Sequence, residues 1–368
     1  MSLQPIYVTQ PSLPPLEEYI PYLEEIWTNR VLTNDGPFHK RLEQALVEHL
    51  GVPQVSLFNN GTIALHVALQ ALCLTGEVIT TPFSFVATTH AIAWSGLTPV
   101  FVDVEPGTLN IDPARIEAAI SPRTTAILAV HCYGTPCDVD AIAEIARRHG
   151  LRVIYDAAHA FGVTVRGESI LRAGDLSVLS FHATKVFNTF EGGAIISPNA
   201  EMKLHIDQMK NFGIVNQTTV VATGTNGKMN EVQAAFGLLQ LKHLGPALER
   251  RLAIDEAYRR ALADITGVRC LEPRPSQVSN GSYFPVLIDE RHPYTRDEVF
   301  SRLAAAGING RRYFYPLIST FPMYAKLPTA DAAHLPVATR AAEQVLCLPI
   351  YADLPPETVE RVAAVLRP

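Results

Sequence analysis

Three short segments of this sequence carry residue types that could do chemistry together. In the first, Asn60-Gly61-Thr62 opens an almost wholly apolar helical run. The first N–H groups of a helix are free and carry positive dipole charge, so glycine and a hydroxyl at this place suit a phosphate. The same residues would also form an ordinary helix N-cap. Taken alone, this segment leaves both interpretations open.

The other two segments place a carboxylate and an amine at the ends of apolar strands. Asp156 closes the run 153–155, where a carboxylate is costly unless it meets a positive partner or caps the next helix. Lys185 follows the run 176–180 and precedes Gly192-Gly193. A lysine in such a place can form a Schiff base with a carbonyl cofactor, because burial lowers the pKa of its amine. A lysine that only extends to solvent is the alternative.

The order of these features along the chain favours a site for pyridoxal 5′-phosphate (PLP). In such a site the lysine holds the cofactor as a Schiff base. The aspartate keeps the pyridine nitrogen protonated, so that the ring can withdraw electrons. The sequence therefore predicts PLP as the cofactor, with Lys185 and Asp156 as catalytic residues.

Short apolar strands alternate with helices between residues 59 and 197, which is typical of an α/β domain with a mostly parallel sheet buried on both faces. Ligands of such sheets collect at the carboxyl ends of the strands. The expected strands are 78–80, 99–103, 126–130, 152–155, 176–180 and 194–197, and the expected helices are 62–74, 87–94, 112–120 and 138–149.

A long helical stretch over 229–262 follows, and Pro246 should end or kink it. Beyond it we expect a strand within 282–289 and helices at 295–306 and 356–366. We therefore predict a large PLP-binding domain over residues 1–245, which includes the N-terminal segment, and a small C-terminal α+β domain over residues 246–368.

Composition narrows the class of protein. The net charge of −6 gives no general attraction to nucleic acid or to a membrane surface. No window approaches the roughly 20 apolar residues of a membrane span. The five scattered cysteines favour reduced thiols over disulfides or a metal site. We therefore expect a cytoplasmic protein without a bound metal. No G-x-G-x-x-G follows the first strand and no Walker A sequence occurs, which disfavours a nicotinamide dehydrogenase or an NTPase.

Over essentially its whole length the chain resembles the DegT/DnrJ/StrS family of fold-type I PLP enzymes, the sugar-nucleotide aminotransferases. Several blocks in the same order carry the resemblance. They are Asn60-Gly-Thr-Ile-Ala-Leu-His66, Pro82-Phe-Ser-Phe-Val-Ala-Thr88, Pro99-Val-Phe-Val-Asp103, Asp156-Ala-Ala-His159, Ser180-Phe-His-Ala-Thr-Lys185, Glu191-Gly-Gly193, Gly224-Thr-Asn-Gly-Lys-Met229 and Leu348-Pro-Ile350.

The resemblance implies a role for each matching residue. Asn226 would reach the phosphate of the neighbouring subunit, which implies a homodimer with shared active sites. His182, three residues before Lys185, could be a proton shuttle or a substrate contact, and we count it among the expected catalytic residues; a structural histidine is the alternative. The implied cofactor-binding residues are Asn60, Gly61 and Thr62 with Ser180 for the phosphate, Phe85 for stacking on the ring, Asp156 for the ring nitrogen and Lys185 for the Schiff base. The implied substrate-binding residues are Arg311, Arg312 and Tyr313, for which a solvated loop is the alternative.

Two positions depart from the family pattern. His159 stands where the family usually has glutamine, near the cofactor's 3′-oxygen; it can still donate a hydrogen bond there, but a charge on it would alter the site. Lys228 replaces an arginine, which puts any bidentate contact at that place in doubt.

The resemblance predicts amino transfer from glutamate to a keto-deoxy sugar nucleotide. The lysine block is most similar to enzymes that make TDP-4-amino-4,6-dideoxy-D-glucose from TDP-4-keto-6-deoxy-D-glucose, and 3-aminotransferases of TDP sugars share that block. In the related 3-dehydratases a histidine replaces the Schiff-base lysine, and Lys185 argues against that class. A regulatory protein on the same fold without transaminase activity is the alternative from another class, and a yellow purified protein would exclude it.

Overall fold

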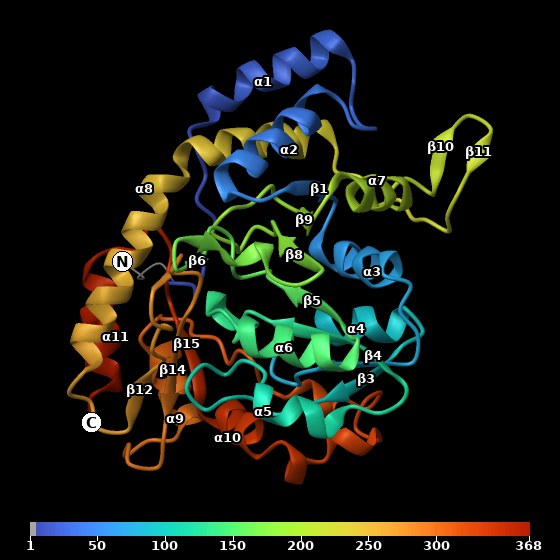
Figure 1. Cartoon of the computed structure of the whole chain (residues 1–368). Coiled ribbons are helices and arrows are strands. Elements are labelled where there is room, and N and C mark those ends of the chain that lie inside the picture. The colour runs from blue at the N-terminus through green and yellow to red at the C-terminus, as the bar shows by residue number, and fades with distance from the viewer. Residues whose placement is uncertain (1–4) are drawn as a thin grey trace.

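The structure, a computed structural model, describes residues 5–368 and is built around a seven-stranded sheet (Figure 1). In spatial order the strands are β1 (Gln54–Phe58), β9 (Gly193–Ser197), β8 (Leu176–Ser180), β5 (Arg152–Asp156), β4 (Thr124–Val130), β2 (Glu77–Thr80) and β3 (Thr98–Phe101). Strands β8, β5, β4, β2 and β3 run parallel, and β9 is antiparallel to both β8 and β1.

Neighbouring residues along each strand pack on opposite faces of this sheet. Val78 and Ile195 join a core with helices α3 (Gly61–Ala71), α4 (Ala87–Trp94) and α7 (Ala200–Met209). Ile79 faces the other side, toward α5 (Pro113–Ile116) and α6 (Val139–His149), and Ile196 faces α2 (Pro37–Leu50) and α8 (Glu231–Leu262). Both faces of the sheet are therefore buried under helices, which explains why the strands are apolar runs in the sequence.

All six strands expected between residues 59 and 197 are present in this sheet, and the α/β class is confirmed. Strand β1 was not foreseen. It lies at the edge of the sheet, and buried Ser56 interrupts its apolar run, which obscures the pattern.

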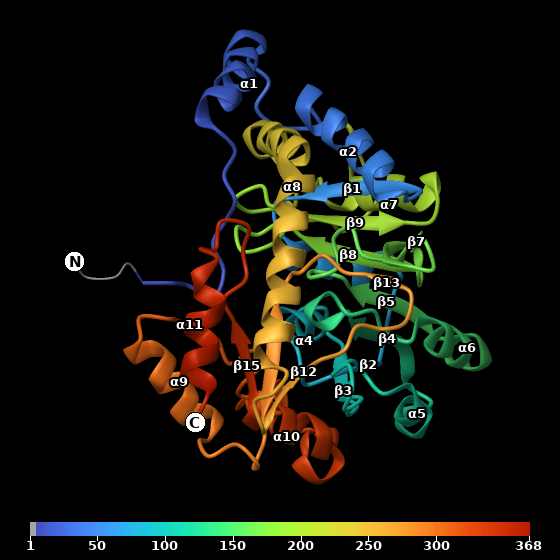
Figure 2. The same cartoon turned by 90° about the vertical axis from the view of Figure 1, so that its left-hand side faces the viewer.

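Helix α8 runs along the length of the molecule (Figure 2). It continues through Pro246, so of the two expected outcomes, an end or a kink, the end does not occur. Phe236 and Leu239 in its first half pack with the large sheet, whereas Tyr258 and Leu262 in its second half pack with the C-terminal strands. This change of packing partners along α8 is in line with the proposed domain boundary near residue 245. The packing of both halves of α8 also outweighs the free-energy cost of a proline within the helix.

The C-terminal part contains a three-stranded antiparallel sheet in the order β12-β14-β15, made of Val268–Cys270, Phe284–Ile288 and Val345–Leu348. Three helices lie against it: α9 (Arg296–Ala305), α10 (Pro336–Gln344) and α11 (Glu357–Leu366). The N-terminal segment also lies here, because Ile6 exchanges backbone hydrogen bonds with Gly307 and Asn309.

The remaining elements lie at the edges. Helix α1 (Leu16–Asn29) packs on α8, and the hairpin of β10 (Ile214–Asn216) and β11 (Thr219–Val220) extends away from the body (Figure 1). A small sheet joins β13 (Gln277–Val278), β6 (Thr164–Val165) and β7 (Glu168–Ser169). Within residues 5–368, no helix is long and apolar enough to cross a bilayer.

Candidate active site

The N-terminus of α3 faces the ends of β8 and β9. Asn60 caps the helix, because its Oδ1 accepts a 2.9 Å hydrogen bond from the N–H of Ile63. The N–H groups of Gly61 and Thr62 precede the first bonded turn and have no partner within the helix. A Cβ on Gly61 would lie 3.1 Å from Cβ of Ser180, and one on Gly193 would lie 2.7 Å from N of Gly61. Glycine thus permits a close approach that places two free amides beside the Ser180 hydroxyl.

Asp156 ends β5 in a buried position beside α4. Its Oδ2 accepts a 2.7 Å hydrogen bond from Oγ1 of Thr88, and its Oδ1 accepts one of 3.1 Å from the N–H of Ala158. Burial raises the pKa of Asp156, while these two bonds and Lys185 oppose the rise. The carboxylate is therefore one that gains from a cationic partner in the adjoining cavity.

Lys185 lies in the turn after β8, where its N–H donates to the carbonyl of His182 at 2.9 Å. Its Nζ lies 5.7 Å from the centroid of the Tyr283 ring. Burial lowers the pKa of Lys185 to about 8, and the Asp156 carboxylate acts in the opposite direction. About a tenth of the amine is therefore uncharged at pH 7, far more than for an ordinary lysine, and the uncharged form is the one that attacks a carbonyl carbon.

His182 and His159 occupy different surroundings. His182 is exposed; its Nδ1 accepts from the N–H of Thr184 at 3.2 Å, and its Nε2 lies 3.6 Å from a carboxylate oxygen of Glu191. His159 is buried, and its Nδ1 accepts from the N–H of Tyr133 at 3.2 Å. Burial, followed by the charge of Lys185, lowers the pKa of His159 well below its usual value, so this ring is neutral.

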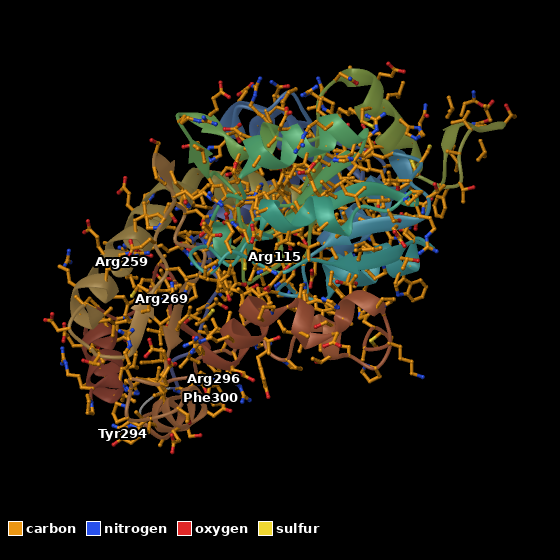
Figure 3. The ribbon with its side chains drawn as sticks, turned by 60° about the horizontal axis from the view of Figure 1, so that its bottom comes forward. Arg115, Arg259, Arg269, Tyr294, Arg296 and Phe300 are labelled. Carbon is orange, nitrogen blue, oxygen red and sulfur yellow. The ribbon has the colours of Figure 1, made fainter. Side chains whose placement is uncertain are left out.

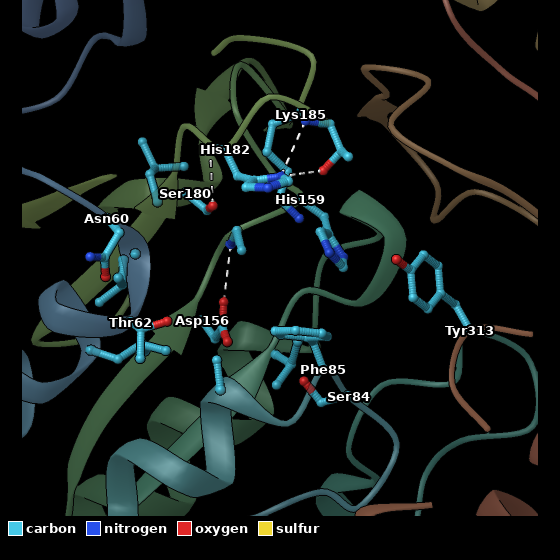
Figure 4. A pocket seen from close by; sticks show the side chains of 18 of the residues that line it. Asn60, Thr62, Ser84, Phe85, Asp156, His159, Ser180, His182, Lys185 and Tyr313 are labelled. Carbon is cyan, nitrogen blue, oxygen red and sulfur yellow. Dashed lines mark hydrogen bonds between the residues drawn. The ribbon is translucent and has the colours of Figure 1, made fainter. Parts of the chain in front are cut away.

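These side chains line one cavity of about 360 Å³, within the range of small-molecule sites (Figure 4). Figure 4 shows Asp156, His159 and Lys185 converging from different segments of the chain. Among the residues expected from the sequence, the cavity is lined by Asn60, Gly61, Thr62, Phe85, Asp156, His159, Ser180, His182, Lys185, Arg311 and Tyr313.

Two expected residues lie elsewhere. Arg312 donates to Asp297 at 3.0 Å and packs over Phe300, so its side chain is engaged by α9, whose Arg296 and Phe300 are labelled in Figure 3. Asn226 is exposed outside the cavity, and its Oδ1 accepts from Nζ of Lys228 at 2.8 Å. The roles of Arg312 toward the sugar nucleotide and of Asn226 toward a partner's phosphate stay predictions.

Several further residues contact Asp156 or Lys185 or line the same cavity, and no role was predicted for them. Thr88 and Ser84 lie within the block 82–88, and Glu191 lies within the block 191–193, so the sequence contained the signal although no role was attached to it. Tyr283 and Phe314 come from the C-terminal part, and no spacing in the sequence connects them to Lys185.

Comparison with known proteins agrees with this geometry. Residues 16–367 match the model of the DegT/DnrJ/EryC1/StrS aminotransferase family. The chain belongs to this family. It is 56% identical to a dTDP-4-amino-4,6-dideoxy-D-glucose transaminase of Shigella dysenteriae, over 99% of each chain. It is 54% identical to an Escherichia coli protein of the same name, over 100% of this chain and 99% of the other.

A solved structure of DesI in the presence of its TDP-sugar product superposes on this aminotransferase with a TM-score of 0.94 and 38% identity, covering 99% of this chain and 92% of the other. The fold-type I architecture is therefore confirmed, and PLP is the cofactor of this aminotransferase family.

The cavity fits that cofactor. The free amides of α3 and the Ser180 hydroxyl suit a phosphate, and buried Asp156 suits a protonated ring nitrogen. The Lys185 amine, with its lowered pKa, suits covalent attachment of a carbonyl carbon.

Proposed function

We propose that this aminotransferase moves an amino group from glutamate to TDP-4-keto-6-deoxy-D-glucose and so produces TDP-4-amino-4,6-dideoxy-D-glucose. The observation that carries the proposal is the joint placement of Lys185 and Asp156 in a cavity of about 360 Å³, in a chain 56% identical to a transaminase of that name.

PLP, when bound, supplies an electron sink that stabilises negative charge on the reacting carbon. Lys185 is the residue that would hold it. With its Nζ free, Lys185 would take the proton from Cα of the amino acid, and in the second half-reaction it would deliver a proton to the carbon that receives the amine. Its pKa near 8 allows both roles, because neither protonation state is rare near neutral pH.

Thr88 and the N–H of Ala158 orient the Asp156 carboxylate, which would pair with the ring nitrogen. The α3 amides and Ser180 would hold the phosphate end. Arg311 and Tyr313 line the mouth of the cavity from the C-terminal part, and Arg311 packs over the Tyr313 ring at 4.8 Å. A guanidinium there suits the diphosphate of a sugar nucleotide.

We also infer a homodimer in which Asn226 of one subunit serves the phosphate site of the other. The support is that Asn226 does not line the cavity of its own chain and lies next to an exposed apolar hairpin. Exposed apolar side chains beside it suit a protein interface, and they are Phe212, Ile214, Val215, Val220 and Val221. The five free cysteines suit a cytoplasmic enzyme.

The deciding experiment incubates the purified protein with PLP, glutamate and TDP-4-keto-6-deoxy-D-glucose and identifies the product by NMR. The expected product carries the amine at C4. An amine at C3 from a 3-keto isomer would favour the 3-aminotransferase alternative. A colourless protein that makes no amino sugar would favour a regulatory role. Omitting glutamate, or replacing it with alanine, tests the donor.

A further inference from the structure

The ring of His159 is held by the backbone of a turn that is distant in sequence. Because the N–H of Tyr133 donates to Nδ1 at 3.2 Å, Nδ1 is the acceptor and a neutral ring carries its proton on Nε2. Among residues 5–368, Nε2 has no hydrogen-bond partner, and the ring lines the cavity (Figure 4). His159 therefore offers the cavity one neutral donor.

The turn that supplies this N–H is fixed by the buried side chain of Asn110. Oδ1 of Asn110 accepts from the N–H of Cys132 at 2.9 Å, and Nδ2 donates to the carbonyls of Thr135 and Pro136, both at 2.9 Å. All three bonds go to backbone groups on either side of Tyr133. They hold Tyr133 at φ 57°, a left-handed conformation that a residue with a side chain adopts only under constraint.

The turn also packs closely on His159 itself. Gly134 has φ 85°, and a Cβ there would lie 2.8 Å from the carbonyl oxygen of His159. Asn280 donates to that same carbonyl at 2.9 Å, which fixes the backbone of His159 from the C-terminal side. The ring stands edge-on to Tyr283 at 4.8 Å and parallel to Phe314 at 6.2 Å. Small shifts of the turn would therefore change the hydrogen bond from the N–H of Tyr133 to Nδ1 of His159.

We propose that Asn110 is a positioning residue: it holds the turn from Cys132 to Pro136 so that the N–H of Tyr133 fixes His159 with Nε2–H directed into the cavity. The inference rests on the proposed cofactor site. A neutral donor suits an oxygen on the cofactor ring, and it leaves Lys185 and Asp156 as the charged groups beside it. This accounts for how histidine can stand where the family usually has glutamine without adding a charge.

The test is a double-mutant cycle on the holoenzyme, with the pH midpoint of the cofactor's visible absorption as the readout. Asn110→Ala releases the turn, and His159→Gln supplies a carboxamide donor that has no tautomers. We expect Asn110→Ala to shift the midpoint by about half a pH unit or more when His159 is present, and to leave it unchanged in the His159→Gln background. Equal shifts in both backgrounds, or no shift in either, would overturn the proposal.

A second variant covers the case in which Asn110→Ala does not fold. Asn110→Asp keeps an acceptor for Cys132 but sets a carboxylate oxygen against the carbonyls of Thr135 and Pro136, so the same pattern of shifts is expected. Circular dichroism and thermal unfolding verify that each variant is folded.

Nitrogen-15 NMR of histidine-labelled protein gives a readout that does not need the cofactor. The His159 signals are assigned by their loss in His159→Gln. We expect the Nε2–H tautomer in the wild type and a mixed or reversed tautomer in Asn110→Ala; a pure Nε2–H tautomer in the variant would contradict the proposal. A wild-type protein with no visible cofactor band would count against the proposed cofactor site, and the tautomer measurement would still decide the role of Asn110.

Discussion

The hydroxyl of Thr88 donates a 2.7 Å hydrogen bond to Oδ2 of Asp156 across 68 positions of sequence. A hydroxyl has one proton, so the 2.8 Å contact between Thr88 and Ser84 is a donation from Ser84. Burial raises the pKa of Asp156, and the bond from Thr88 is the largest effect that lowers it. The ionisation of the Asp156 carboxylate, which lines the cavity, thus depends on a side chain of α4.

We predict that Thr88→Val lowers kcat roughly tenfold, because a hydrogen bond to a charged group contributes about 1.5–3 kcal/mol. The pKa of Asp156 should rise without that bond. The carboxylate is then lost at a higher pH as pH falls, so the deficit should be largest at acidic pH. Steady-state rates between acidic and neutral pH measure this. Thr88→Ser keeps the hydroxyl and should stay close to wild type; an equal loss in both variants would show that packing alone is affected.

Asp156→Asn should keep the fold and lose most activity, since an amide does not hold the ring nitrogen protonated. Asp103→Asn is a matched control. Asp103 is also buried and follows a strand, but it accepts from the N–H groups of Val337 and Ala338 at 3.0 and 2.7 Å. We expect Asp103→Asn to lower the unfolding temperature and Asp156→Asn to lower kcat. Near-normal turnover in Asp156→Asn would leave Asp156 a structural role only.

Lys185→Ala should abolish both turnover and covalent attachment of the cofactor. Borohydride reduction followed by peptide mapping is expected to place the phosphopyridoxyl group on Lys185 in the wild type and nowhere in the variant. Lys326→Ala, an exposed lysine, is the control and should keep label and activity. Label on Lys210 or Lys228 would overturn the assignment.

The pKa of Lys185 gives a prediction about cofactor attachment. The neutral amine is the reactive form, so the rate at which apoenzyme binds PLP should rise with pH and reach half its maximum near pH 8, instead of near the ordinary value for lysine. Asp156 raises this pKa, so Asp156→Asn should move the midpoint to lower pH. Stopped-flow absorption measures both. A midpoint above pH 10 would show that the amine is not desolvated.

The sequence predicted most of the sheet and the placement of Asp156 and Lys185 in one cavity, because both depend on local signals. Six strands were apolar runs bounded by turns, and Asp156 and Lys185 each follow one of them. Contacts made by tertiary packing have no such local signal. Tyr283, which directly precedes β14, lies next to Lys185 only in the folded chain. Asn110 bonds to the turn that contacts His159 and not to His159 itself. Pro246 failed as a helix end for the same reason, since packing on both halves of α8 outweighs a local preference.

Shared active sites can be tested with a heterodimer of two chains that carry different substitutions. In a heterodimer of Lys185→Ala and Asn226→Asp chains, one site receives both intact residues and the other receives both lesions. Aspartate is chosen because its charge would repel the phosphate, so the second parent should be nearly inactive. Each verified heterodimer should then recover about half of the wild-type activity. Asn199→Asp is the matched control: Asn199 caps α7 through a 2.9 Å bond to Met202, and aspartate caps equally well.

The activity of the heterodimer distinguishes a shared site from a site within one subunit. Asn226 lies outside the cavity of its own chain and bonds to Lys228 of that chain. If Asn226 acted only within its subunit, each chain of the heterodimer would carry one lesion of its own and neither site would be restored. Activity at the level of the parents, in co-expressed heterodimers whose composition mass spectrometry has verified, would therefore remove Asn226 from the partner's site. A strictly monomeric, active enzyme in solution would remove the shared site altogether, because no second chain would be present to supply the residue.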